Sequence, residues 1–469
     1  MNDIGIFVPP GTFPPGFRAF KVPSPDESGV NLEIEIIVSA PGNYLILGCQ
    51  HVAPWPIDDK LPCLVKYSDV GMLDPGFGVD GYAVIDLVQD AKTKGMGRLL
   101  NVVALSDGGY LARLDATVEV EIEGVKHERF CVALARFTKD GKKDAAFGMD
   151  GIATFPLEPP PDVAVSKSGT DGEHERSPRA TIERAPKNSD FPDLVLGDMK
   201  LLPDGKVLVY ASAVNSEKTH RTYVLRILEN GDLDFTLNGS GIVELIVEGA
   251  WFRPFRIAGQ TSDGKFVVSG ERPGVSFVGR FNGDGTLDKN YGTDGDFIDR
   301  GEEYGDAAWH QLLQLRDGSL ICVGHAGSRA AVPGSTGVVA VAKIDGEGHR
   351  VVGFNGGHTV YMSPNSPTGG FSLWSFGALI DDAERVVIAG KQLDEGMIIT
   401  SFIARLLKDG SKDPHLDAGG ITYHKPPDCF NTITEHLEGK GYYATGYIFK
   451  ADGSGGDQLY RLTSKSPPT

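Results

Sequence analysis

The stretch RFNGDGTLDKNYGTDG, residues 280–295, contains a basic residue, an Asp-Gly turn, and then Asp-x-x-aromatic-Gly with a closing Gly. RFTKDGKKDAAFGMDG, residues 136–151, repeats the same frame. Further copies begin at Lys66, Arg226, Lys343, Arg405 and Arg461. The copy at Lys343 is eroded, because Val351 replaces the aspartate and His358 replaces the closing glycine.

Each copy follows a second pattern, a turn with Gly or Asp and then an apolar segment. The basic residues are separated by 54 to 90 residues, with three or four short apolar runs in each interval. Segments 311–315, 320–324, 338–344 and 359–362 are examples of four expected strands. Intervals of this kind fit a four-stranded propeller blade better than a helical repeat.

The fold expected from these repeats is all-β, a seven-bladed β-propeller of four-stranded antiparallel blades. The segment from Asp3 to Val8 resembles the last strand of a blade, and the chain ends just after the third strand of blade seven. The N-terminal strand is therefore predicted to complete the last blade, which would leave no free sheet edge.

These motifs resemble the delta-sixty repeat family of bacterial proteins. The match covers nearly the whole chain and is most specific in residues 136–151 and 280–295. The resemblance implies a propeller but no agreed activity. Members of that family are often exported.

Residues 1–469 are predicted to form a single domain, since a closed array of repeats can exceed the usual domain length. Residues 158–190 depart from the repeat and are polar and Pro-rich. We expect an inserted exposed loop between blades two and three, either a tolerated insertion or a partner-binding segment.

Charge and composition exclude several classes of partner. The formal net charge of −18 would repel a phosphate backbone, so nucleic acid is set aside. No run of 18 apolar residues and no signal peptide stand out, so a membrane span is not expected. Five scattered cysteines indicate a reducing, cytoplasmic location, with signal-independent export left open.

The repeated acidic residues are most simply explained by the fold. The strand-C basic residue has an aspartate eight residues later in five copies, which predicts a structural ion pair. The aromatic or leucine that follows is expected to pack between adjacent blades. Binding of Ca²⁺ by this acidic ring is the weaker alternative, so no cofactor or metal is predicted.

Motifs for common chemistries are incomplete in this sequence. Residues 259–265 match most of a phosphate loop, but Phe266 stands where Ser or Thr is needed. Cys49 with His51, and Cys322 with His325, could ligate zinc, yet they fall in blades one and five.

Tryptophan gives the one functional signal in the sequence. All four tryptophans fall on the loop face formed before the first strand and after the second strand of the blades. Indole offers an apolar face and one N–H donor, which suits a sugar ring or a protein loop. The ligand-binding candidates are Trp55, Trp251, Arg253, Arg256, Trp309, His310, Trp374, Ser375 and Asn431. Simple packing of the indoles between blades is the alternative, and it predicts their burial.

Three functions are consistent with these features. The leading one is a non-catalytic recognition module that binds a protein or glycan through the tryptophan-bearing face. The second is a propeller hydrolase or lyase with a site at the mouth of the central channel, where His310 and Asp306 could do acid–base work. The third is a structural or toxin-associated subunit. The sequence leaves the oligomeric state open.

Overall fold

The computed structural model describes most of the chain. The described residues are 17–21, 32–40, 44–51, 61–68, 72–87, 99–122, 125–158, 197–214, 220–247, 252–272, 275–301, 304–327, 337–363, 372–393, 399–416, 420–424, 429–435, 441–449 and 455–463.

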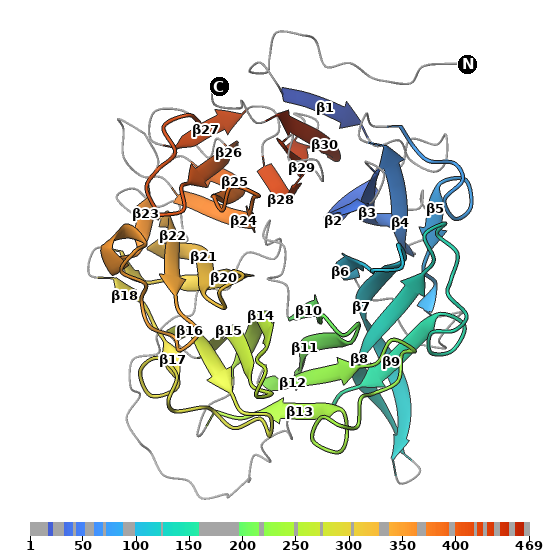
Figure 1. The fold of residues 1–469 in the computed structure, drawn as a ribbon. Helices are drawn as coiled ribbons and strands as arrows, with labels where there is room; N and C mark the ends of the chain where they lie inside the picture. Colours follow the sequence, from blue (N-terminus) through green and yellow to red (C-terminus); the bar gives the residue numbers. More distant parts are fainter. Residues whose placement is uncertain are drawn as a thin grey trace, which may run out of the picture.

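The described chain is an all-β propeller whose antiparallel sheets follow one another around a central axis (Figure 1). Five of these sheets have four strands each. They contain β2 (Leu32–Ala40), β3 (Tyr44–His51), β4 (Leu61–Ser68) and β5 (Tyr82–Val84); β6 (Leu99–Ala104), β7 (Tyr110–Ile122), β8 (Val125–Phe137) and β9 (Ile152–Pro156); β10 (Asp198–Leu201), β11 (Val207–Val214), β12 (His220–Ile227) and β13 (Ile242–Leu245); β14 (Arg253–Gln260), β15 (Phe266–Arg272), β16 (Val275–Phe281) and β17 (Asp296–Phe297); and β28 (Cys429–Glu435), β29 (Gly441–Phe449), β30 (Gly455–Thr463) and β1 (Phe17–Lys21).

The remaining large sheet has eight strands. One half contains β20 (Ala308–Gln314), β21 (Leu320–Gly327), β22 (Gly337–Ile344) and β23 (Val360–Met362), and the other β24 (Ser372–Ile380), β25 (Val386–Leu393), β26 (Ile399–Leu406) and β27 (Ile421–His424). A single parallel bridge, Gly337 to Ser372, joins β22 to β24. A hairpin of β18 (Arg300–Gly301) and β19 (Gly305–Asp306) and a short 3-10 helix, η1 (Asn355–Gly357), complete the described elements.

This connectivity corrects the predicted blade count. Seven separate four-stranded blades were expected, whereas the described residues form six blades, because the Gly337–Ser372 bridge merges two expected blades into one sheet. The predicted closing segment, Asp3 to Val8, lies outside the described residues. The strand that pairs with β30 is β1, in antiparallel register from Phe17 opposite Leu462 to Lys21 opposite Gln458.

The innermost strands surround the axis. In chain order they are β2, β6, β10, β14, β20, β24 and β28, and each contacts the next, with β28 contacting β2 (Figure 1). The second and third strands of a sheet are covered on both faces, so their sequences are almost continuously apolar, as in the buried strand β22. The hydrophobic cores therefore lie between successive sheets.

The repeated ion pair is confirmed in five copies. The basic residue of the third strand lies 2.7–3.1 Å from the aspartate eight residues later. The pairs are Lys66–Asp74, Arg136–Asp144, Arg226–Asp234, Arg280–Asp288 and Arg405–Asp413.

The aromatic of each copy packs between sheets, also as predicted. Phe77 lies edge-on against Tyr110 of the following sheet, with ring centroids 5.9 Å apart. Tyr291 and Phe354 are fully buried in the cores shared with the next strands along the chain.

The inserted segment 158–190 lies outside the described residues except for Glu158, whose carboxylate is 3.3 Å from Arg221. No helix of the described part of the chain is both long and apolar enough to cross a membrane.

Candidate functional site

A one-residue bulge recurs in the innermost strands. In β20 the register slips between Trp309 and Gln311, which leaves His310 as an extra residue. A β-bulge of this kind redirects one side chain out of the regular alternation. The extra residues of β2, β6, β14, β20, β24 and β28 are Glu35, Leu100, Phe255, His310, Phe376 and Asn431. In β10 the corresponding position, just before Asp198, is Gly197.

A second set of equivalent positions lies at the end of the second strand of each four-stranded unit. In β21 it is His325, which directly follows Gly324, the residue opposite Trp309. The residues at this position are Gln50, Asp115, Ser212, Glu271, His325, Lys391 and Tyr447.

We call these two sets together the axial rim. Residues with a structural role recur at the same position in successive blades, as the Arg–Asp pairs do. The second set instead has a different polar residue type in each of its seven copies. The blades therefore do not require one particular residue at this position.

One part of the axial rim contains a histidine pair. His310 Nε2 lies 3.0 Å from His325 Nδ1, and the two rings stack with centroids 4.7 Å apart. Phe255 packs against His310 at a centroid distance of 4.7 Å. One imidazole donates its N–H and the other accepts it, according to their tautomers.

Cations flank this pair. Arg253 forms an ion pair of 2.6 Å with Glu271 and lies 5.4 Å from the centroid of Phe255. Lys391, which is 8% exposed, lies 5.4 Å from the centroid of Phe376. In both cases the positive charge lies against an aromatic face, and this attraction helps to hold the cation at the rim.

A second histidine contact lies at the part of the rim formed by β11 and β12. Ser212 Oγ is 3.0 Å from Nδ1 of His220. Burial, with a further contribution from the Arg253 charge, lowers the pKa of His220 to about 4. His220 is therefore neutral at pH 7.

Below the rim, polar side chains tie the innermost strands together. Asn101 donates to Asp198 at 2.9 Å, Arg256 donates to Gln311 at 3.3 Å, and Gln311 donates to the carbonyl of Phe376 at 3.2 Å. The predicted ligand residue Arg256 thus serves a contact between β14 and β20.

Arg113 lies beneath this network and is fully buried. Burial lowers its pKa to about 10, against the opposing charge of Asp198. Arg113 therefore remains protonated at pH 7.

The structure separates the predicted site residues into two groups. Arg253, His310, Ser375 and Asn431 lie at or beside the axial rim, and the Ser375 hydroxyl is 3.4 Å from the carbonyl oxygen of Gly324. Trp55 and Trp251 lie outside the described residues, and Trp374 lies in β24 with its side chain outside the described set.

Trp309 corrects the expectation of an exposed aromatic face. It is 0% exposed and stacks on Phe297 with ring centroids 5.9 Å apart. The residue before the bulge points into the core between sheets, so this indole fills space and presents no surface to a ligand. Burial of the indole is what the packing alternative predicts.

Of the rim residues, the sequence predicts only His310 and Asn431 as ligand-binding candidates. Among those not predicted as such are Phe255, His325, Phe376 and Lys391. In the sequence His325 is a candidate only as a zinc ligand with Cys322, and Cys322 is buried in the core. The usable signal is the residue after the second-strand glycine, which changes its chemistry from copy to copy: Glu271, His325 and Lys391.

The aspartates of the repeat form ion pairs that stabilise the fold. Asp234 lies 2.8 Å from Arg226 and 3.3 Å from Lys206. Within the described part of the chain, no group of three or more His, Cys, Asp or Glu side chains is arranged to hold a metal ion. The expectation of no cofactor stays a prediction, with Ca²⁺ as its weaker alternative.

Comparison with known proteins gives similarity of fold only. No family model and no curated protein matches the chain. A polysaccharide lyase structure is similar with 13% identity and a TM-score of 0.44, covering 92% of this chain and 90% of that one. An ulvan lyase from a new family of polysaccharide lyases has 8% identity and a TM-score of 0.46, covering 95% and 96%. An alpha-L-arabinofuranosidase from Fusarium graminearum has 12% identity and a TM-score of 0.38, covering 78% and 94%. The resemblance to the delta-sixty repeat family and the cytoplasmic location stay predictions.

Proposed function

We propose that this protein is a glycan-cleaving enzyme, and that its reaction is acid–base elimination at the axial rim. The observation that carries the proposal is the hydrogen bond between His310 and His325, with cations on either side. This contact supports the second of the predicted functions, a propeller hydrolase or lyase, more than it supports the non-catalytic recognition module.

The kinds of groups at the rim favour elimination over hydrolysis. Glycoside hydrolysis generally requires two carboxyl groups that flank the scissile bond. The rim positions also include three carboxyl residues, Glu35, Asp115 and Glu271, of which Glu271 is engaged by Arg253. We assign the reaction to the two imidazoles, whose nitrogens lie 3.0 Å apart. Elimination from a uronate needs a base for a carbon-bound proton and a cation for the neighbouring carboxylate, which are the groups gathered here.

The roles follow from this chemistry. A neutral imidazole of the pair accepts the proton from the carbon next to the substrate carboxylate. The electron pair forms a carbon–carbon double bond as the bond to the glycosidic oxygen breaks. That oxygen receives a proton from the imidazole pair, which returns to its neutral form. Arg253 or Lys391 pairs with the carboxylate and stabilises the negative charge that develops on it. The faces of Phe255 and Phe376 offer apolar surface to the sugar rings.

The test is an assay of the purified protein on uronate-containing polysaccharides, with a neutral glucan as the control substrate. Elimination yields an unsaturated sugar that is followed by its ultraviolet absorbance. We expect His310→Gln and His325→Gln to reduce kcat by about a hundredfold or more, because general acid–base catalysis contributes about that much. His349→Gln is the matched control, since the His349 side chain is 62% exposed in a distant turn.

Two results would count against the proposal. New reducing ends without the double bond would replace elimination with hydrolysis. Saturable glycan binding without any product would return the protein to the class of recognition modules.

A further inference from the structure

The eroded copy of the repeat lacks one half of the structural ion pair. In the intact copies the aspartate N–H donates to the carbonyl of the basic residue, as from Asp288 to Arg280 at 2.8 Å. Val351 N–H donates to the Lys343 carbonyl at 3.0 Å in the same way. Val351 therefore occupies the place of the aspartate, with the backbone of the motif preserved.

The missing carboxylate leaves Lys343 in an unusual position. The corresponding Lys66 forms an ion pair of 3.1 Å with its own aspartate, Asp74. Within the described part of the chain, the Lys343 ammonium has neither an ion pair nor a hydrogen bond. This copy of the motif thus keeps its backbone hydrogen bond but lacks the carboxylate that the other copies place beside the basic residue.

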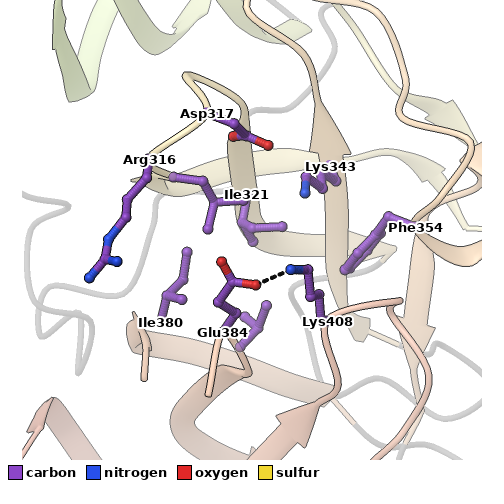
Figure 2. A pocket seen from close by; sticks show the side chains of 10 residues that line it. Arg316, Asp317, Ile321, Lys343, Phe354, Ile380, Glu384 and Lys408 are labelled. Atoms are coloured by element: carbon purple, nitrogen blue, oxygen red, sulfur yellow. Dashed lines mark ion pairs between the residues drawn. The ribbon is translucent and has the colours of Figure 1, made fainter. Parts of the chain in front are cut away.

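A pocket of about 260 Å³ opens at this place, between the β20–β23 and β24–β27 halves of the eight-stranded sheet (Figure 2). Its walls combine apolar side chains with charged ones. The lining residues are Leu315, Arg316, Asp317, Ile321, Lys343, Phe354, Ile380, Glu384, Val386 and Lys408. The pocket involves the turn that follows β20, so it lies at the opposite end of the innermost strands from the bulge of the axial rim.

Three cations line the pocket, Arg316, Lys343 and Lys408, and of these Lys343 belongs to the repeat copy that lacks its aspartate. Figure 2 shows Lys408 joined to Glu384 on one side of the pocket, with Lys343 on another. The hydroxyl of Ser319 holds the pKa of Asp317 below its ordinary value, and Lys343 contributes to that lowering. Lys408 lowers the pKa of Glu384, again with a smaller contribution from Lys343. The carboxylates of Asp317 and Glu384 reduce the net positive charge of the pocket, but neither forms an ion pair with Lys343 in the described part of the chain.

We propose that this pocket binds a small organic carboxylate with an apolar body. The ligand carboxylate takes the place of the absent aspartate and pairs with Lys343. The apolar body packs on the side chains of Ile321, Phe354 and Val386, which are almost fully buried. The volume lies just below the range of drug-sized pockets, so it suits a ligand of about one ring. This site is independent of the proposed elimination reaction.

Binding of benzoate and isovalerate to the full-length protein, measured by calorimetry and by ligand-observed NMR, tests the proposal. The neutral amides of the same two acids serve as control ligands. We expect both carboxylates to bind saturably and their amides not to bind. Lys343→Met should weaken carboxylate binding on the order of tenfold to a hundredfold, because it removes the charge and keeps most of the apolar length.

Val351→Asp is the decisive variant, because it restores the aspartate of the repeat beside Lys343. It should abolish carboxylate binding and raise the Tm. Val352→Asp is the matched control, since Val352 is 75% exposed and the substitution adds the same charge one residue away. This control should bind as the unaltered protein does.

The outcomes separate this site from the axial rim. Undiminished binding by Val351→Asp, or failure of both carboxylates to bind, would overturn the proposal. His310→Gln should leave carboxylate binding unchanged, so loss of the proposed enzymatic activity and loss of this site can be told apart.

Discussion

At the scale of single residues, the recurring ion pair shows how a charge can be kept inside a repeat. Arg280 and Asp288 are 7% and 5% exposed at their side chains and lie 2.8 Å apart. Arg280 also donates to the carbonyl of Gly346 at 3.0 Å and to Glu347 at 2.8 Å. A buried guanidinium with several partners links one turn to the next along the ring.

Asp288→Asn should therefore be strongly destabilising. Removing one partner of a buried ion pair costs about 3–5 kcal/mol. The lower end applies here, because Arg280 keeps the Gly346 carbonyl and Glu347 as partners. Glu347→Gln alters the exposed partner of the same arginine, whose side chain is 62% exposed, and should cost about 1 kcal/mol or less. Urea denaturation of both variants measures the difference, and equal midpoints would contradict this interpretation.

The same motif predicts a pH dependence at Asp234. Burial raises the pKa of this carboxyl, but hydrogen bonds from Thr236 and the charges of Arg226 and Lys206 outweigh burial and lower it to about 2. A carboxyl whose folded pKa is depressed stabilises the fold above its unfolded pKa, about 3.9, and loses this contribution as the pH falls through the folded value. The difference in unfolding free energy between the unaltered protein and Asp234→Asn should be constant from pH 7 to about 5 and shrink between about pH 4 and 2. A difference that stays constant down to pH 2 would argue against this assignment.

At the scale of elements, the turn motif forms the joint between successive sheets. In four copies the N–H after the buried aromatic donates to a turn carbonyl of the next repeat at 2.7–2.8 Å. The donors are Gly78, Gly148, Gly292 and Asn355, and the acceptors are Asp140, Asn230, Glu347 and Asp409. Gly148 has φ of +55° and Asn355 has φ of +47°, a region that glycine and asparagine tolerate best. The motif is thus repeated because each copy fixes both its own turn and its neighbour.

Gly231→Ala tests this joint. A Cβ at Gly231 would lie 2.7 Å from the backbone nitrogen of Gly148 in the preceding sheet, and its φ of +92° adds strain. We expect a loss of about 3 kcal/mol from strain and overpacking together. Gly239→Ala is the matched control, with φ of +71° and nothing within 4 Å of the added atom, and should cost about 1 kcal/mol. Thermal unfolding of the two variants should show a clear difference in Tm; similar Tm values would mean that the joint is not tight.

At the scale of the whole molecule, two distant parts of the chain share one sheet. β1 pairs with β30, so residues 17–21 cover the outer edge of the sheet formed by β28, β29 and β30. An uncovered edge strand offers unpaired N–H and carbonyl groups to other chains.

Deletion of residues 1–21 should therefore lower the Tm and promote concentration-dependent association. Deletion of residues 1–16 keeps β1 and serves as the control. Light scattering and thermal unfolding of the two truncated proteins distinguish them. Identical behaviour would show that the pairing of β1 contributes nothing to stability.

The local features of this protein follow from its sequence alone. The basic residue and its aspartate are eight residues apart on either side of one turn, so the motif predicts their ion pair and the aromatic that packs beside it. The spacing of the copies predicts four-stranded antiparallel sheets, because only short strands and tight turns fit between them.

Other features arise only when segments from different strands come together. A one-residue bulge in β20 turns His310 toward His325 and leaves Trp309 facing the core, and neither direction is encoded in local spacing. The bridge from Gly337 to Ser372 merges two expected blades. The pocket at Lys343 exists because Ile380, Glu384, Val386 and Lys408, from the second half of the eight-stranded sheet, lie opposite residues of the first half. The histidine pair, the merged sheet and the pocket depend on contacts between residues far apart in the chain. The repeat sets the approximate positions of the strands but does not determine these contacts.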